Sequence, residues 1–238
     1  MRKTFVVARR ELAAYFVSPM AYVIGALFLA VSGGYFFQSI FVPGEEASLR
    51  PLFEGMAWLM VAAVPLLTMR LLSDEVRMGT IETLMTAPIS DAEVIAGKFL
   101  GVLTFYLVLL AMTVVFLVLM GVYGQPDAGV AVMGYFGMVL LGAAFLAAGV
   151  LASALTRYQV LAAVVGAAFL ASFTVFMQIV VTYGSEPWSS IAARLNAMTY
   201  FKDFSRGVFD TRGLVFFLTA TVLLLFLSVK VLESRRWR

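Results

Sequence analysis

The sequence contains no cysteine and no histidine. The chain therefore cannot form a disulfide or a Cys or His metal site, and it lacks the commonest general base and the Ser/His/Asp triad. Charged residues are also scarce, at 13%, whereas 62% of the residues are apolar and the mean hydropathy is +0.97. A soluble domain is nearer about half apolar and about a quarter charged. The composition excludes a soluble globular domain and indicates an integral membrane protein.

Long apolar runs make up most of the chain, and about 20 apolar residues are needed to cross the hydrocarbon core. Six such runs predict membrane-spanning helices at about residues 20–42, 53–69, 99–123, 130–154, 158–183 and 214–232. Only residues 155–157 separate the fourth run from the fifth, so one long kinked helix is the alternative there. No internal repeat is visible, and we expect one all-α polytopic transmembrane domain over residues 1–238.

The distribution of Lys and Arg predicts the orientation of the chain. If the N-terminus is cytoplasmic, twelve of the 17 basic residues lie on the cytoplasmic side, including those of segments 70–98 and 155–157 and of the C-terminus. An even number of spans then places both termini in the cytosol. The net charge of +3 is better explained by contact with anionic lipid than with nucleic acid.

Several kinds of chemistry have no support in the residues. A phosphate-binding loop is absent, so the chain does not bind and hydrolyse ATP in the P-loop manner. Adjacent acids occur only at Glu45-Glu46 and Asp74-Glu75, both in loops, so a paired Asp-rich magnesium motif is missing. No ionisable residue lies near the middle of a span, where proton-coupled carriers usually place one.

Mildly polar side chains do occur within the spans: Gln38, Thr68, Thr104, Thr113, Thr174 and Gln178. Each could line a path. Threonine in a span more often bonds its own helix, and glutamine more often bonds a neighbouring helix. Small residues also recur at a spacing of four, at Ala144, Ala148 and Ala152, at Gly149 and Ser153, at Ala162 and Gly166, and at Ala163, Ala167 and Ala171. Such rows favour close helix packing, within the bundle or between subunits.

Residues 1–18 precede the first apolar run and have an amphipathic pattern. On a helical wheel the apolar side chains share one arc and the basic ones occupy the adjacent arc: Phe5, Ala8, Leu12, Tyr15 and Phe16, and Arg2, Lys3, Arg9 and Arg10. This pattern predicts a helix lying in the cytoplasmic interface. An ordinary positively charged flank is the alternative. We do not expect a cleavable signal peptide, because the run that follows is long enough to span.

The segment 70–98 is too polar to span and too patterned to be disordered. Gly79 and Thr80 indicate a helix start, with Thr80 as N-cap and Glu82 in the first turn. Further on, Ser90 to Glu93 forms a capping-box pattern, so the next helix should start in the cytosol and continue into the third span.

The short helix predicted between these two points has one apolar face. Ile81, Leu84 and Met85 recur at i, i+3 and i+4, and Pro88 ends the helix. Nothing within its own loop can bury this face. A docking site for a partner and a face that packs back onto the bundle or the lipid interface are both compatible with the pattern.

The segment 184–213 should lie on the outer side. Apolar side chains recur there every three or four residues, and Pro187 occupies a plausible first helical position. We expect one or two short amphipathic helices in the outer interface. They could form a lid that only seals the bundle, or take part in handling a substrate.

Three stretches together resemble the ABC-2 type transporter permeases, in matching order over nearly the whole chain. They are VARRELAAYFVSPMAYVIGALFLAVSGGYFF at residues 7–37, DEVRMGTIETLMTAPISDAEVIAGKFLG at residues 74–101, and FSRGVFDTRGLVFFL at residues 204–218. The segment 74–101 is the most specific of the three. Within the family the sequence is most similar to the gliding-motility-associated (GldF-like) branch, although it lacks the large extra domain of some partner subunits in those systems.

The resemblance implies six spans, an N-terminal elbow helix, a cytoplasmic coupling helix after the second span, and short outer helices before the sixth. The elbow helix corresponds to a segment that includes Arg9, Arg10, Glu11 and Phe16. The segment that couples to an ATPase corresponds to Asp74, Glu75, Arg77, Gly79, Thr80, Ile81, Glu82, Leu84, Met85 and Pro88. The family often shows two acids and a basic residue before the coupling helix. Here the residues are Asp74-Glu75-Val76-Arg77, which is close to that pattern but not identical.

The resemblance also implies partners. The chain would form the translocation path, as a dimer with itself or with a related permease. The direction that the resemblance implies is export. Two separate ATPase subunits would bind ATP and Mg²⁺, so this chain would hold no cofactor, no metal and no catalytic residue. It would lie in lipid, in a cell inner membrane, and would not bind nucleic acid.

Two other functional classes remain compatible with parts of the pattern. A non-transporting mechanotransmission or scaffold subunit would keep the ATPase dock but need no open path. Substrate-stimulated ATPase activity separates it from a transporter. A membrane enzyme acting on lipid would need a group of carboxylates or lysines facing the interface, which the sequence does not show.

Overall fold

The structure is a computed structural model that describes residues 2–40, 48–79, 89–123 and 127–235. The described chain is almost entirely helical. In chain order the helices are α1 (Arg2–Val17), α2 (Pro19–Ile40), α3 (Arg50–Thr68), α4 (Ser73–Met78), α6 (Asp91–Met112), α7 (Val114–Tyr123), α8 (Ala128–Leu155), α9 (Gln159–Ala171), α10 (Met177–Tyr183), α11 (Trp188–Leu195), α12 (Ala197–Ser205) and α13 (Thr211–Arg235). A π-helical stretch, Ser172–Phe176, joins α9 to α10.

Within the described ranges, six helical segments are long and apolar enough to cross a membrane, as the sequence predicts. They are Pro19–Gln38, Arg50–Met78, Asp91–Val122, Ala128–Leu155, Gln159–Tyr183 and Thr211–Ser234. The fold is therefore that of an all-α polytopic membrane protein.

The third span begins well before the apolar run that predicts it, because α6 starts with a capping box. The Ser90 side chain accepts a hydrogen bond from the Glu93 N–H, and the Glu93 carboxylate accepts one from the Ser90 N–H. The predicted start of this helix at the capping box, ahead of the apolar run, is confirmed.

The fourth and fifth spans are two separate helices. Helix α8 ends at Leu155, Thr156 has an extended backbone with φ −122° and ψ 157°, and α9 begins at Gln159. The alternative of one long kinked helix is therefore wrong, because an extended residue interrupts the helical hydrogen bonds.

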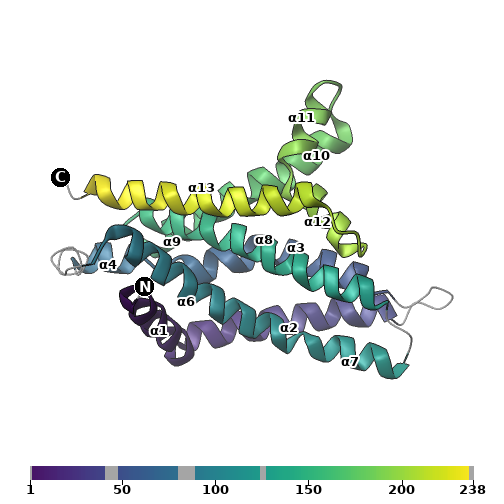
Figure 1. Cartoon of the computed structure of the whole chain (residues 1–238), viewed down its shortest axis with the longest axis horizontal. Coiled ribbons are helices and arrows are strands. Elements are labelled where there is room, and N and C mark those ends of the chain that lie inside the picture. Colours follow the sequence, from purple (N-terminus) through teal and green to yellow (C-terminus); the bar gives the residue numbers. More distant parts are fainter. Residues whose placement is uncertain (1, 41–47, 80–88, 124–126, 236–238) are drawn as a thin grey trace.

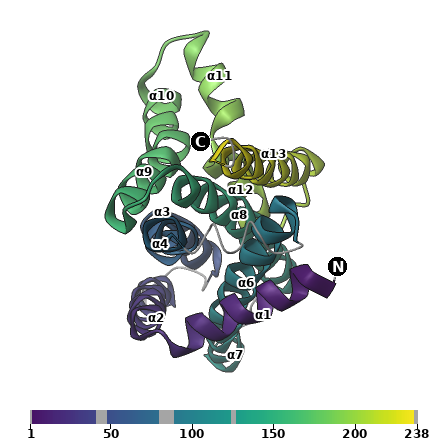
Figure 2. The same ribbon diagram turned by 90° about the vertical axis from the view of Figure 1, so that its left-hand side faces the viewer.

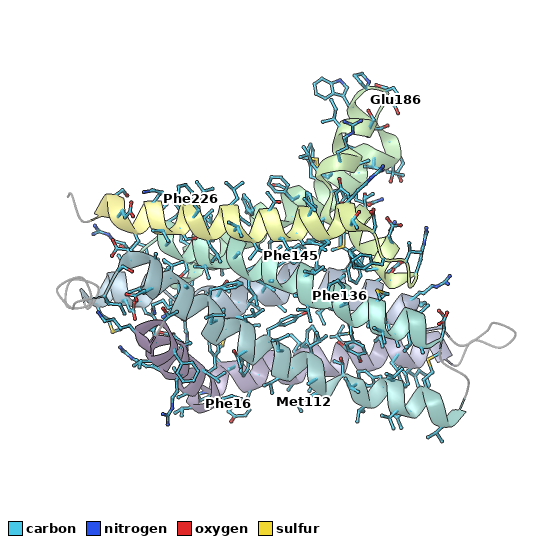
Figure 3. All side chains as sticks on the ribbon, in the orientation of Figure 1. Phe16, Met112, Phe136, Phe145, Glu186 and Phe226 are labelled. Atoms are coloured by element: carbon cyan, nitrogen blue, oxygen red, sulfur yellow. The ribbon has the colours of Figure 1, made fainter. Side chains whose placement is uncertain are left out.

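Helix α8 forms the centre of the bundle, surrounded by α3, α6, α9 and α13 (Figure 2). Of its apolar stretch, 83% is buried inside the protein, compared with 17% for the stretch in α13. Figure 3 shows the contrast: Phe145 of α8 lies inside the bundle, whereas Phe226 of α13 points outward. The spans around α8 thus leave broad apolar surfaces for contact with lipid.

The small residues of α8 allow this central position. Ala144, Ala148 and Ala152 are buried. A Cβ atom added to Gly149 would lie 2.1 Å from Oγ1 of Thr68, so α3 and α8 approach closely. Two of the predicted small-residue rows therefore serve packing within the bundle.

Both ends of the described chain lie at the same end of the bundle, together with α4 (Figure 1). Helix α1 crosses this end over α6. This arrangement agrees with an even number of spans. That this end faces the cytosol remains a prediction from the Lys and Arg distribution.

Segment 184–213, where one or two short helices are predicted, contains two, α11 and α12, and they differ in their surroundings. Helix α11 projects with α10 away from the bundle, with Glu186 near the tip (Figure 3). Trp188 in this projection is 65% exposed. In contrast, Phe201 and Phe204 of α12 are buried against the bundle, where a Cβ atom on Gly137 of α8 would lie 2.6 Å from the Cβ atom of Phe204.

Candidate functional site

Helix α4 follows directly on α3 at the end of the bundle that also holds α1, and it carries three of the predicted coupling residues. Asp74 and Glu75 occupy its first turn and Arg77 its last turn, which places each charge where it is favourable in the field of the helix dipole. Gly79 ends the helix in the left-handed conformation, with φ 69°. The sequence predicts a helix starting near Gly79, but not the helix that Gly79 ends.

A buried lysine connects α4 with two other helices. The Lys98 Nζ atom of α6 lies 2.7 Å from a carboxylate oxygen of Glu11 in α1 and 2.8 Å from one of Glu75 in α4. The Lys98 side chain is 2% exposed, and the two glutamates are 15% and 12% exposed. We call Glu11, Glu75 and Lys98 the Lys98 junction. It joins three segments that are far apart in the sequence.

Two glycines allow α1 to reach this lysine. A Cβ atom on Gly97 would lie 2.6 Å from the Cβ atom of Val7, and one on Gly101 would lie 2.7 Å from the Cβ atom of Glu11. Gly97 and Gly101 are four residues apart on α6, so they present one small-residue surface to α1. The close approach carries Glu11 to the ammonium group.

Tyr15 fixes the other half of α1. Its hydroxyl donates a hydrogen bond of 2.7 Å to the Leu67 carbonyl of α3, and its ring stacks on Phe105 of α6 at 4.9 Å. Burial, with a smaller contribution from the nearby Glu11 carboxylate, raises the pKa of the Tyr15 phenol well above its usual range. The phenol therefore stays a hydrogen-bond donor at physiological pH.

Neutral hydrogen bonds hold α4 to the central helix. The Ser153 Oγ atom of α8 accepts hydrogen bonds from the N–H groups of Leu72 at 3.0 Å and Ser73 at 3.1 Å, and it donates one to the Met69 carbonyl at 3.2 Å. These backbone groups belong to the turn between α3 and α4, and the Met69 carbonyl also accepts a hydrogen bond from the Ser73 hydroxyl.

A second contact joins α4 to α9, through the uncharged Gln159 amide. The Gln159 side chain donates to the Asp74 carboxylate and accepts a hydrogen bond of 3.3 Å from the Nε atom of Arg70. Helix α4 is thus linked to α1 and α6 through charged groups, and to α8 and α9 through an uncharged hydroxyl and an amide.

The structure brings together only some of the predicted site residues. Glu11 and Glu75, assigned to the elbow and to the coupling segment respectively, meet at Lys98, whereas Arg9, Arg10 and Arg77 are exposed. Phe16 is 43% exposed and contacts Phe105 edge-on at 5.7 Å. The remaining predicted coupling residues lie outside the described residues: Thr80, Ile81, Glu82, Leu84, Met85 and Pro88.

In the sequence, Lys98 is one positive charge among the many on the predicted cytoplasmic side. A usable signal was present, because a lysine flanked by two glycines at a spacing of four marks a surface that another helix can approach. Ser153 was predicted only as a small packing residue at a spacing of four from Gly149, and not as a hydrogen-bond partner of the turn between α3 and α4.

The threonines within the spans are structural, as their residue type suggests. The hydroxyls of Thr68, Thr104, Thr113 and Thr174 each donate to a carbonyl of their own helix. Gln178 accepts a hydrogen bond of 2.9 Å from the Asn196 side chain, which also caps α12. Over the described residues, no group of three or more Asp, Glu, His or Cys side chains is placed to hold a metal ion.

Apolar spans surround a central helix, and this arrangement defines a polytopic membrane protein. The ion pairs of the Lys98 junction lie at one end of its bundle, beside one membrane surface. A family model for the ABC-2 family transporter proteins matches residues 6–232, so the chain belongs to this family. It is accordingly a permease subunit of an ABC transporter. No curated protein sequence gives a significant match to the chain.

Proposed function

We propose that this permease forms a translocation path that is driven by a separate cytoplasmic ATPase, and that it works as an exporter. Family membership supports the transport role. The observation that carries the coupling proposal is the Lys98 junction, because it fixes the helix that leads into the predicted dock to two other helices. The resemblance of residues 7–37 and 74–101 supports the gliding-motility-associated branch.

The predicted dock lies between α4 and α6 in the sequence. In the proposal, Ile81, Leu84 and Met85 insert into a groove of the ATPase, as an amphipathic helix does in helix-in-groove recognition. Charges around this face, such as Glu82 and Arg77, set orientation more than affinity.

The proposed motion then passes through helices that are already fastened together. Closure of the ATPase dimer displaces the dock, and the displacement reaches α4, and through Lys98 also α1 and α6. These helices bias the bundle between inward-open and outward-open packings. ATP and Mg²⁺ belong to the ATPase, and a second permease copy or a related permease completes the path.

The test is a detergent pull-down of the candidate ATPase with wild type, Leu84→Asp and Leu155→Asp. Leu155 is a matched control, because it is 51% exposed at the end of α8 that lies beside α4. We expect wild type and Leu155→Asp to retain the ATPase and Leu84→Asp to lose it. Retention by Leu84→Asp would contradict the proposed dock, and absence of binding to a folded wild type would remove the motor from the proposal.

Transport itself needs a separate measurement. In proteoliposomes that contain the complete complex, a transported substrate should raise the ATPase rate and accumulate on one side of the membrane. A complex that hydrolyses ATP without any substrate response or accumulation across a substrate panel would favour the mechanotransmission subunit instead.

A further inference from the structure

A cavity of about 270 Å³ lies at the end of the bundle between α1, the start of α2, the end of α3, and α4. Lys98 of α6 contributes to its wall. The Lys98 junction holds α1 and α4 on its two sides. The cavity lies at the ends of two spans, where the hydrocarbon of a bilayer meets its polar part.

The lining of this cavity is divided by polarity. Met20 and Ile24 of α2 and Leu66 and Leu67 of α3 supply an apolar part from within the spans. Charged side chains of the surrounding helices supply the other part: Arg10, Glu11, Arg70, Asp74, Glu75 and Lys98. An occupant that satisfies both parts must have an apolar tail and a polar head, because an apolar wall gains nothing from a fully polar ligand.

The charges around the polar part are balanced in number but not in pairing. The lining contains three cations and three carboxylates, so its formal net charge is zero. Lys98 is already paired with two carboxylates, whereas neither Arg10 nor Arg70 forms an ion pair with any acid among the described residues. Arg70 donates one hydrogen bond, to the neutral Gln159.

These two guanidinium groups are the donors left for a ligand. Arginine has five N–H donors in a planar fork that matches the oxygens of a phosphate. The third carboxylate, Asp74, accepts a hydrogen bond from Gln159 and keeps further acceptor positions. The cavity therefore offers anion-binding and cation-binding groups beside an apolar wall.

We propose that this cavity binds a zwitterionic aminophospholipid, of the phosphatidylethanolamine type. Its phosphate lies between Arg10 and Arg70, its ammonium group faces Asp74, and an acyl chain follows Ile24 and Leu66. The zero net charge of the lining favours a zwitterionic headgroup over an anionic one, because an added net charge would be left without a counter-charge. This site is independent of the proposed ATPase dock.

The experiment uses the purified full chain alone, without an ATPase, in a lipid-free detergent. Retention of lipid in native mass spectrometry and the shift of the unfolding temperature are measured with four probes: dioleoyl-phosphatidylethanolamine, dioleoyl-phosphatidylcholine, dioleoyl-phosphatidylglycerol and soluble phosphoethanolamine. We expect phosphatidylethanolamine to bind most tightly. Phosphatidylcholine lacks N–H donors for Asp74, phosphatidylglycerol carries an uncompensated charge, and phosphoethanolamine lacks the acyl chains.

Arg10→Gln and Arg9→Gln form the matched pair of variants. Both residues are exposed neighbours on α1, but only Arg10 lines the cavity. Loss of one charge-assisted contact should weaken binding of phosphatidylethanolamine by roughly tenfold or more in Arg10→Gln, and leave it unchanged in Arg9→Gln. Arg70→Gln should act like Arg10→Gln. Asp74→Asn should remove the preference for phosphatidylethanolamine over phosphatidylcholine.

Four results would overturn the proposal. Equal affinity in Arg10→Gln and wild type would show that the cavity is not the site, and an equal loss in Arg9→Gln would show attraction to the basic helix as a whole. Equal binding of phosphatidylglycerol would exclude a zwitterionic headgroup, and equal binding of phosphoethanolamine would assign the site to a soluble phosphomonoester. Since Arg10 is exposed and lies outside the Lys98 junction, its variant should fold even if Arg70→Gln does not.

Discussion

Replacing Lys98 with methionine tests whether the Lys98 junction holds the end of the bundle together. Methionine keeps an unbranched side chain of similar length but removes the charge. Both glutamates, at 15% and 12% exposure, would then lose their contact with the Lys98 ammonium group. Removing one partner of a buried ion pair costs about 3–5 kcal/mol, and the residual exposure of the glutamates favours the lower half of that range. We expect Lys98→Met to lower the free energy of unfolding by roughly 3 kcal/mol.

The matched control is Lys230→Met in α13. Lys230 also forms an ion pair of 2.7 Å, with Glu233, but these two side chains are 54% and 41% exposed. An exposed pair of this kind contributes about 0–1 kcal/mol, so this variant should stay close to wild type. The free energy of unfolding is measured by titration with sodium dodecyl sulfate in mixed micelles, followed by tryptophan fluorescence or circular dichroism.

A third variant separates charge from packing. Glu11→Gln, Lys98→Met and Glu75→Gln together remove all three charges and keep the side-chain volumes similar. If uncompensated charge is the cause, the triple variant should recover most of the stability that Lys98→Met loses. The reasoning fails if Lys98→Met costs no more than Lys230→Met, or if the triple variant is as unstable as Lys98→Met.

Two further variants test the other contacts of this end. Because the pKa of Tyr15 is raised in the folded chain, its contribution to stability is present below the unfolded-state pKa of about 10 and is lost as the pH rises above that value. In unfolding titrations at several pH values, Tyr15→Phe should reduce this loss of the free energy of unfolding at alkaline pH. The same pH dependence in wild type and Tyr15→Phe would contradict a buried phenol. Ser153→Ala should destabilise by about 1–3 kcal/mol in the same titration, because it leaves the Leu72 and Ser73 N–H groups without their acceptor. Ser190→Ala, in exposed α11, is its control and should stay within about 0.5 kcal/mol of wild type.

The six spans could be predicted from the sequence because lipid imposes a length and a composition that few other environments require. Their ends were less accurate, since a helix can continue into water once the apolar run has ended. The start of α6 was nevertheless predictable, because the Ser90–Glu93 capping box marks a helix start by its own chemistry.

Helix α4 and the Lys98 junction could not be predicted in the same way. Helix α4 has only six residues and no apolar period, so its signals were limited to Asp74 and Glu75 at its start and Gly79 at its end. The pairing of Lys98 depends on how closely α1 approaches α6, which is a tertiary property. The close contact between α1 and α6 also decides which face of α1 is covered. Val7 contacts α6, whereas Phe5, expected on the apolar face, is 70% exposed.

The difference between the contacts of α4 indicates which of them can rearrange during the proposed transport cycle. Buried ion pairs join α4 to α1 and α6, whereas the Ser153 hydroxyl and the Gln159 amide join it to α8 and α9. Breaking a buried ion pair costs about 3–5 kcal/mol. A bond of an uncharged hydroxyl contributes only about 1 kcal/mol, and the bond from the Gln159 amide to the Asp74 carboxylate about 1.5–3 kcal/mol. A transition driven by ATP should therefore leave α1, α4 and α6 together and rearrange their contacts with α8 and α9. In that case Ser153→Ala would change the equilibrium between the two states of the bundle, whereas Lys98→Met would weaken the unit of α1, α4 and α6 that moves together.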